Sequence, residues 1–164
     1  MNRILVTGKN GQLGKSIQKL TINTKQNEEF IFVGRDELDL CDENNIISYF
    51  KNHVFDFIIN CAAYTQVDKA EEEPLLANQV NHLAVSKLAQ IAKNQKAKLI
   101  HISTDYVFDG KNVNPYLETD KTNPINIYGK TKLTGEKLIM KFCKKNKINY
   151  GILRFFNVAG ASSS

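Results

Sequence analysis

Tyr128 and Lys132 are the residues whose types and spacing suggest chemistry most directly. They stand four positions apart, so both side chains lie on one face if the segment is helical. A tyrosine with the ordinary pKa of about 10 is a poor proton donor at neutral pH, and a neighbouring ammonium favours the phenolate and lowers that pKa. The pair therefore predicts a general acid that donates a proton to a ketone oxygen. A chance pair on a lysine-rich helix is the alternative.

The segment Ser103-Thr104-Asp105-Tyr106 places polar side chains directly at the end of an apolar run that is typical of a strand. In an open parallel sheet, ligands bind beside the carboxyl ends of the strands. The hydroxyl of Thr104 is therefore predicted to face the same carbonyl oxygen as Tyr128. A local turn capped by that hydroxyl is the alternative.

A glycine-rich motif follows the first apolar run and opens a helical pattern. One glycine allows a tight turn, another lets the backbone approach a pyrophosphate, and a third lets helix and strand pack closely. Free N–H groups and the dipole at the helix start attract negative charge. The motif therefore predicts a phosphate cradle for a dinucleotide, with a structural turn as the alternative. The residues assigned to it are Gly8, Asn10, Gly11, Gln12, Leu13 and Gly14.

The second apolar run ends in Gly34-Arg35, at the place where an acidic residue normally binds the ribose of NAD. An arginine there can pair with a 2′-phosphate, which favours NADP(H) over NAD(H). Asp36 follows directly, and a surface arginine is the alternative.

Five short apolar runs alternate with longer segments of helical spacing. This alternation is typical of βαβ units and predicts an α/β fold with a parallel sheet buried on both faces. The predicted strands are residues 3–7, 30–33, 55–60, 98–103 and 150–155.

Apolar residues at steps of three and four predict the helices that connect these strands. Asp42 is a plausible N-cap of the second helix. Residues 109–126 are predicted to form a long loop of the kind that tends to be functional, and Ser162 to Ser164 to be frayed. The helical stripes are Leu13, Ile17 and Leu20; Ile46, Ile47 and Phe50; Leu76, Val80, Leu83, Ala84, Leu88 and Ile91 after Pro74; and the segment 128–145.

The composition, with 42% hydrophobic and 24% charged residues, excludes a disordered or fibrous chain. The net charge of +5 is concentrated as lysines in 130–147, which we interpret as a solvated helix face rather than a nucleic-acid site, because no aromatic residues interleave with it. Cys41, Cys61 and Cys143 lack the spacing of a metal site or disulfide framework. With no signal-peptide pattern and no apolar stretch of about 20 residues, we expect a cytoplasmic protein without a membrane span.

The three motifs, in this order, resemble the extended short-chain dehydrogenase/reductases, and within them the dTDP-4-dehydrorhamnose reductases. The resemblance covers nearly all of residues 1–153, and its two middle motifs are much more specific than the glycines. The resemblance rests on four segments: residues 8–14, which contain the sequence Gly11-Gln12-Leu13-Gly14, residues 60–71 (NCAAYTQVDKAE), residues 103–110 (STDYVFDG), and Asn123-Pro124 followed by residues 128–132 (YGKTK).

The resemblance implies a Rossmann-type doubly wound sheet, a single NAD(P)-binding domain over 1–164, and reduction of a 4-keto nucleotide-sugar with NADP(H) or NAD(H). Tyr128 would protonate the C4 ketone oxygen, Lys132 would hold the nicotinamide ribose, and Thr104 would bond the reacting oxygen. Relatives pair through two long helices, which implies a homodimer. The remaining implied contacts are Asp105 with the sugar, Asp39 and Leu40 with the adenine, Ala62, Ala63, Tyr64 and Thr65 beside the cofactor, and Asn81 supporting the site, with a surface asparagine as the alternative for the last.

Two features depart from the family pattern. The family is roughly twice as long, so most of its small substrate-binding domain has no counterpart here. Residues 153–160 resemble UDP-sugar 4-epimerases instead. A nucleotide-sugar 4-epimerase with tightly held NAD therefore stays open, as does a non-catalytic dinucleotide-binding module like the regulatory subunit of methionine adenosyltransferase.

Overall fold

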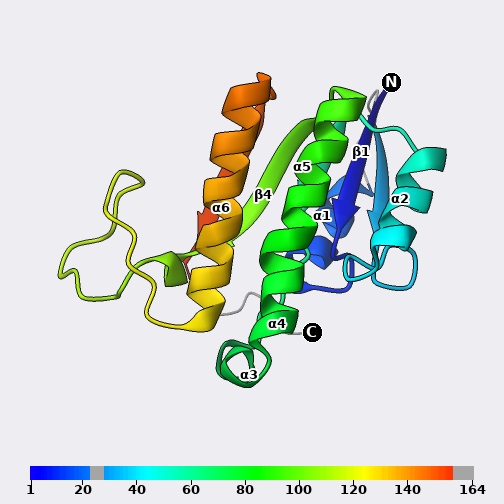
Figure 1. Cartoon of the computed structure of the whole chain (residues 1–164). Coiled ribbons are helices and arrows are strands. Elements are labelled where there is room, and N and C mark those ends of the chain that lie inside the picture. The colour runs from blue at the N-terminus through cyan, green and yellow to red at the C-terminus, as the bar shows by residue number, and fades with distance from the viewer. Residues whose placement is uncertain (23–27, 157–164) are drawn as a thin grey trace.

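Five parallel strands form one sheet in the computed structural model, which describes residues 1–22 and 28–156. The order across the sheet is β2-β1-β3-β4-β5, and the sheet lies behind the long helices in Figure 1. The predicted α/β class with a Rossmann-type parallel sheet is confirmed. The strands are β1 Asn2–Thr7, β2 Glu28–Val33, β3 Phe57–Asn60, β4 Lys98–Thr104 and β5 Tyr150–Phe155.

The centre of the sheet is covered on both faces. Leu5 and Val6 are neighbours in β1 whose side chains point to opposite faces, and both are fully buried. The parallel register sets Thr7, at the end of β1, beside Val33 of β2 and Asn60 of β3. The carboxyl ends of these strands therefore meet at one edge, where a ligand site is expected.

Helices lie on both faces of the sheet. Right-handed crossovers put α1 on one face and α2, α5 and α6 on the other, and Figure 1 shows α5 and α6 in front of the strands. The segment η1 is a π-helix and η2 is a 3₁₀ turn. The bounds are α1 Gln12–Thr21, α2 Glu43–Asn52, α3 Val67–Glu72, α4 Pro74–Asn78, η1 Gln79–Leu83, α5 Ala84–Gln95, η2 Asp105–Val107 and α6 Ile127–Asn146.

The main hydrophobic core fills the space between the sheet and α2, α5 and α6. It contains Leu5 and Ile58 from the sheet, Leu88 from α5 and Ile139 from α6, all fully buried. Gly135 brings α6 close to η1, since a Cβ at this position would lie 2.4 Å from the carbonyl oxygen of Asn81. The helix that carries Tyr128 and Lys132 is thereby fixed against its neighbours.

The helix after Pro74 differs from the predicted stripe. Leu76 and Leu83 are 38% and 43% exposed, and alanines such as Ala77 and Ala84 form much of the buried face. The predicted stripe is therefore right for Ala84 and Leu88, which are buried, and wrong for Leu76 and Leu83, because the π-helical turn of η1 interrupts the 3.6-residue period.

The other helices and the loop follow the predictions more closely. Asp42 caps α2 as predicted, by accepting from the N–H groups of Asn44 and Asn45. Two residues of the predicted helical stripes, Ile47 and Leu20, are exposed and do not belong to the core. Residues 109–126 contain neither helix nor strand. The predictions for 157–160 and for Ser162 to Ser164 lie outside the described residues.

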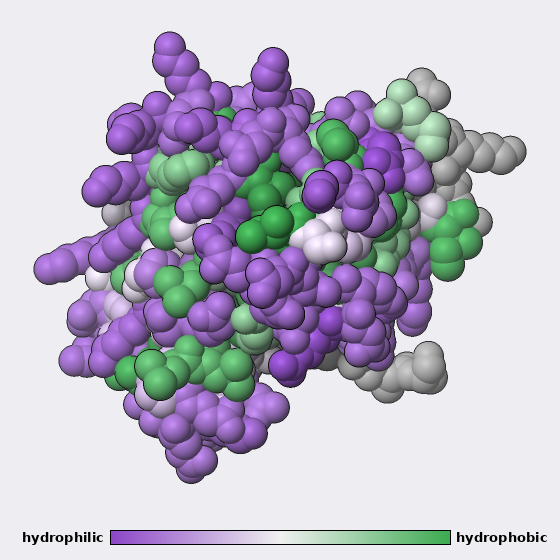
Figure 2. All heavy atoms as spheres, turned by 45° about the vertical axis from the view of Figure 1, so that its right-hand side comes forward, coloured by the Kyte–Doolittle hydropathy of each residue, from purple (hydrophilic) through white to green (hydrophobic). Residues whose placement is uncertain are grey.

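The face shown in Figure 2 is dominated by hydrophilic residues, with apolar side chains in scattered groups. Within residues 1–22 and 28–156, no helix is long and apolar enough to cross a bilayer. The same residues contain no group of three or more His, Cys, Asp or Glu side chains that could hold a metal ion. Cys41, Cys61 and Cys143 are free.

Candidate active site

A cleft of about 1070 Å³ lies at the carboxyl ends of the strands. Its walls include the glycine turn after β1, the loop after β3, the end of β4 and the first turns of α6. The structure therefore brings every residue of the predicted site to one cleft, while their individual roles stay predictions. These residues are Gly8, Asn10, Gly11, Gln12, Leu13, Gly14, Arg35, Asp39, Leu40, Ala62, Ala63, Tyr64, Thr65, Thr104, Asp105, Tyr128 and Lys132.

The glycine turn has the geometry that the motif predicts. Gly8 has a φ of +73°, and a Cβ there would lie 2.8 Å from the backbone nitrogen of Ala62. A Cβ at Gly14 would lie 2.3 Å from the carbonyl oxygen of Gly8. Gly11 is the N-cap of α1, and no side chain in the described part of the chain caps it. The first N–H groups of α1 are therefore free to face an anion in the cleft.

Arg35 stands at the rim of the cleft beside Asp39. Its Nε donates to Asp39 Oδ2 at 3.1 Å, and its side chain is 76% exposed. Burial alone would raise the pKa of Asp39, but hydrogen bonds from the backbone N–H of Cys41 and from Arg35 lower it. The guanidinium is thus held at the cleft by a carboxylate and keeps most of its donors in solvent.

Tyr128 is 8% exposed and lies edge-to-face against Tyr106, with ring centroids 5.4 Å apart. Burial raises its pKa, and hydrogen bonding to the Thr104 hydroxyl acts in the opposite direction. The prediction that Lys132 lowers this pKa is wrong for the protein without ligands. The ammonium of Lys132 instead donates to the carbonyl oxygen of Ile102 at 2.6 Å.

Lys132 is almost completely enclosed, with 1% of the residue exposed. Burial lowers its pKa to about 8, and the neighbouring Glu136 partly offsets that effect. A chance surface pair with Tyr128 is thereby excluded, because neither side chain lies on the solvent face of α6.

The Thr104 hydroxyl caps the turn that follows β4, which was the alternative role for this residue in the sequence analysis. Its Oγ1 accepts from the N–H of Tyr106 at 3.3 Å and donates to Asp105 Oδ1 at 3.0 Å. The same side chain is close enough to Tyr128 to affect its pKa. Capping therefore holds the hydroxyl beside the phenol at the cleft.

Asn81 ties the loop after β3 to α6. Its Oδ1 accepts from the N–H of Tyr64 at 2.9 Å, and its Nδ2 lies 3.1 Å from Tyr64 O and 3.2 Å from Thr131 Oγ1. The residue is buried on the π-helical turn, so the surface alternative is wrong. Such turns occur frequently at functional sites.

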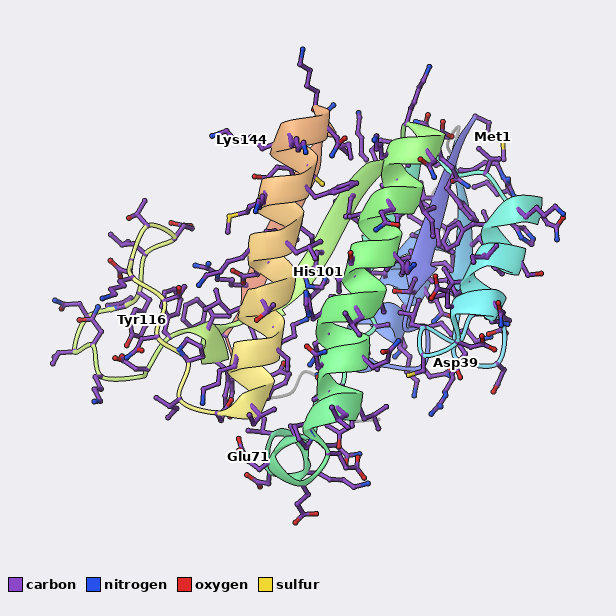
Figure 3. The ribbon with its side chains drawn as sticks, in the orientation of Figure 1. Met1, Asp39, Glu71, His101, Tyr116 and Lys144 are labelled. Atoms are coloured by element: carbon purple, nitrogen blue, oxygen red, sulfur yellow. The ribbon has the colours of Figure 1, made fainter. Side chains whose placement is uncertain are left out.

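Sequence reasoning missed a polar network at the ends of the central strands. Thr7 Oγ1 donates to Asn60 Oδ1 at 2.7 Å, and Asn60 Nδ2 lies 3.1 Å from His101 Nδ1. All three residues are buried, and Figure 3 shows His101 between α5 and α6 in projection. Thr7 and Asn60 end β1 and β3, so their position was the available signal, whereas His101 lies within β4 and gave none. Cys61 and Phe155 are further lining residues that the sequence analysis did not assign to the site.

Comparison with known proteins gives the family. The sequence matches the family model described as RmlD substrate binding domain over residues 1–163. A dTDP-4-dehydrorhamnose reductase of Sinorhizobium fredii is 42% identical over 134 residues, which are 82% of this chain and 44% of that protein.

Two crystal structures of dTDP-4-dehydrorhamnose reductases have a similar fold. The protein from Clostridium acetobutylicum gives a TM-score of 0.86 at 38% identity, covering 99% of this chain and 56% of that chain. The protein from Bacillus anthracis, in complex with NADP, gives a TM-score of 0.86 at 34% identity with the same coverage. This chain spans about half the length of these relatives. It belongs to the RmlD family of extended short-chain dehydrogenase/reductases, as its motifs indicated.

Proposed function

We propose that this chain is the NAD(P)H-binding part of a reductase that acts on the 4-keto group of a nucleotide-sugar, with residues 1–164 forming one dinucleotide-binding domain. The observation that carries the proposal is the single cleft that joins the glycine turn to Tyr128, Lys132 and Thr104. A phosphate-binding turn and a proton donor serve one reaction only if they face the same space.

The residues present fit a dinucleotide. A Cβ at Gly14 would lie 2.3 Å from the carbonyl oxygen of Gly8, so this glycine lets the start of α1, with its free N–H groups, pack closely against the turn that would hold a pyrophosphate. Arg35 offers free donors to a 2′-phosphate, which favours NADPH, and the Bacillus anthracis relative is described in complex with NADP. Asp39 and Leu40 would lie at the adenine, and the stretch from Ala62 to Thr65 beside the rest of the cofactor.

The bound dinucleotide supplies the hydride that reduces the ketone carbon. Tyr128 donates its phenolic proton to the ketone oxygen as charge develops there, and burial keeps the phenol protonated until that moment. Thr104 donates a hydrogen bond to the same oxygen after releasing Asp105, which is then free to contact the sugar. Lys132 holds the nicotinamide ribose and stabilises the phenolate that remains.

The test is a titration with NADPH and NADH, followed by nicotinamide fluorescence, in the original protein and in Tyr128→Phe. The variant should bind dinucleotide within about twofold of the original. Its reduction of dTDP-4-dehydrorhamnose should fall by about 10²-fold or more, since general acid catalysis is worth that much. Equal turnover in the two proteins would refute the chemistry.

A non-catalytic dinucleotide-binding module is the second candidate, because the glycine turn and the free N–H groups at the start of α1 would bind a pyrophosphate whether or not Tyr128 donates a proton. Tight binding of NADPH without turnover of any 4-keto sugar nucleotide would decide for it. Interconversion of UDP-glucose and UDP-galactose without added cofactor would instead indicate a 4-epimerase, since the sequence of residues 153–160 resembles those enzymes.

A further inference from the structure

The inner face of α6 carries three polar residues at steps of four, namely Tyr128, Lys132 and Glu136. Residues four apart on a helix are neighbours on one face. Lys132 is 1% exposed and Glu136 is 0% exposed. A buried carboxylate costs several kcal/mol to desolvate unless its charge is matched, so Glu136 requires an explanation.

Arg154 of β5 pairs with that carboxylate in two-point geometry. Its Nε lies 3.0 Å from Glu136 Oε1, and its Nη2 lies 2.7 Å from Oε2. The guanidinium stacks over the ring of Phe108 at 5.1 Å, and Phe108 stacks in turn on Tyr116 of the long loop. The Glu136 side chain is fully buried while that of Arg154 is 19% exposed, so the charge of Glu136 is weakly screened.

Within the described residues, the ammonium of Lys132 has no anionic hydrogen-bond partner. Its hydrogen-bond acceptor, the carbonyl of Ile102, is neutral. The titratable side chains that interact with it are Cys61 after β3, His101 in β4 and Glu136 in α6, with Arg154 of β5 behind Glu136, while Tyr128 stands one turn earlier on α6.

Burial raises the pKa of Cys61 to about 11, while burial lowers the pKa of His101 and raises that of Tyr128. These three side chains are therefore neutral at neutral pH. Glu136 is thus the anionic side chain that faces Lys132 within the described part of the chain.

We propose that Glu136, held in place by Arg154, is a positioning residue that keeps the Lys132 side chain charged and directed at the cleft. The proposal rests on the proposed function in one respect, namely that Lys132 contacts the dinucleotide. Arg154 is then as important as Glu136. It holds the Glu136 carboxylate one helical turn from the Lys132 ammonium, so that Glu136 and Lys132 do not form a direct ion pair.

The test follows the state of Lys132 by two readouts. The first is the pH dependence of NADPH affinity, measured by nicotinamide fluorescence. In Glu136→Gln, the pH above which affinity is lost should fall by about one unit, so affinity at pH 8 should be about fivefold weaker than in the original protein. Glu136→Asp keeps the charge and should restore the original profile. Glu28→Gln removes an exposed carboxylate at the far end of β2 and should change nothing.

The second readout uses the protein without ligands. As pH rises, the urea midpoint should begin to increase near pH 8 in the original protein, where native Lys132 loses its proton. In Glu136→Gln this rise should begin about one unit lower. This readout does not depend on the dinucleotide. A shifted urea profile together with no binding of NADPH would therefore count against the proposed function and not against the role of Glu136.

The double variant Glu136→Gln/Arg154→Met separates positioning from structure. Removing both partners of a buried ion pair is often neutral for stability. If the pair only holds β5 to α6, the double variant should show the original pH profiles, which would overturn the proposal. If Glu136 acts on Lys132, the double variant should fold normally and keep the lowered profiles. Unshifted profiles in folded Glu136→Gln would also overturn it.

Discussion

Lys132→Met should make the protein more stable at pH 7 while weakening its binding of NADPH. The pKa of Lys132 is lowered from 10.5 to about 8, chiefly by burial. This shift corresponds to about 3 kcal/mol of unfavourable free energy for the charged side chain in the native state. Methionine has a similar length and no charge, so it removes that cost. Methionine cannot donate the hydrogen bond to Ile102 O, and losing this bond destabilises the native state by about 1 kcal/mol. We therefore expect a net gain of about 2 kcal/mol.

The pH dependence of this gain follows from the direction of the shift. Below pH 8, lysine is charged in both native and unfolded chains, and the native state bears the full cost. Between pH 8 and 10.5 the native state releases its proton while the unfolded state keeps it, so the original protein becomes relatively more stable as pH rises. The advantage of the methionine variant should therefore shrink by about 1 kcal/mol between pH 7 and pH 9.

Urea unfolding of both proteins at the two pH values measures this difference. Lys137→Met is the matched control, because Lys137 is exposed on the same helix. The control should change the unfolding free energy by less than about 0.5 kcal/mol at either pH. A methionine variant at position 132 that is less stable at pH 7, or whose gain is the same at pH 9, would refute the reasoning.

Three further variants test the framework of the cleft. Gly14→Ala should lower the free energy of unfolding by about 1–3 kcal/mol and abolish tight NADPH binding. Gly151→Ala is the control and should bind NADPH normally, because no atom lies within 4 Å of its added Cβ. Thermal unfolding and fluorescence titration compare the two variants. Because burial holds His101 neutral, the unfolded state alone takes up its proton below pH 6.5, and stability falls with pH. In His101→Gln, the free energy of unfolding should fall less steeply with decreasing pH, by about 1.4 kcal/mol per pH unit, as measured by urea unfolding at pH 5–7. Asn81→Ala should cost about 2–3 kcal/mol and weaken NADPH binding, and an unchanged titration would argue against its support of the loop after β3.

The sheet and its glycine turn could be predicted from the sequence because they depend on local rules. The alternation of apolar runs with helical spacing determines the strands, and the requirement for close approach at Gly8 and Gly14 is independent of distant residues. Asp42 was likewise predictable as a cap, because capping involves only the next few N–H groups.

The parts that could not be predicted depend on which residues meet across the fold. The direction of the Lys132 ammonium is determined by a carbonyl in β4, thirty positions away, so the spacing to Tyr128 gave its face but not its partner. The helix after Pro74 approaches α6 at Gly135, where a Cβ would lie 2.4 Å from the carbonyl oxygen of Asn81, and no pattern in the sequence signals this contact. The pairing of Glu136 with Arg154 had no sequence signal, since a glutamate and an arginine eighteen positions apart are unremarkable until β5 returns beside α6.

The two ends of the cleft are lined by different parts of the fold. The end that we propose for the dinucleotide is formed from the turn after β1, the loop after β2 and the loop after β3, all within the described residues. The end beside Tyr128 is lined by Thr104, Asp105 and Tyr106, with Phe155 and Phe156 half exposed at the margin. Under the proposed function, binding of NADPH and turnover of a sugar depend on different ends of the cleft, and the fluorescence titration tests the end that contains the glycine turn.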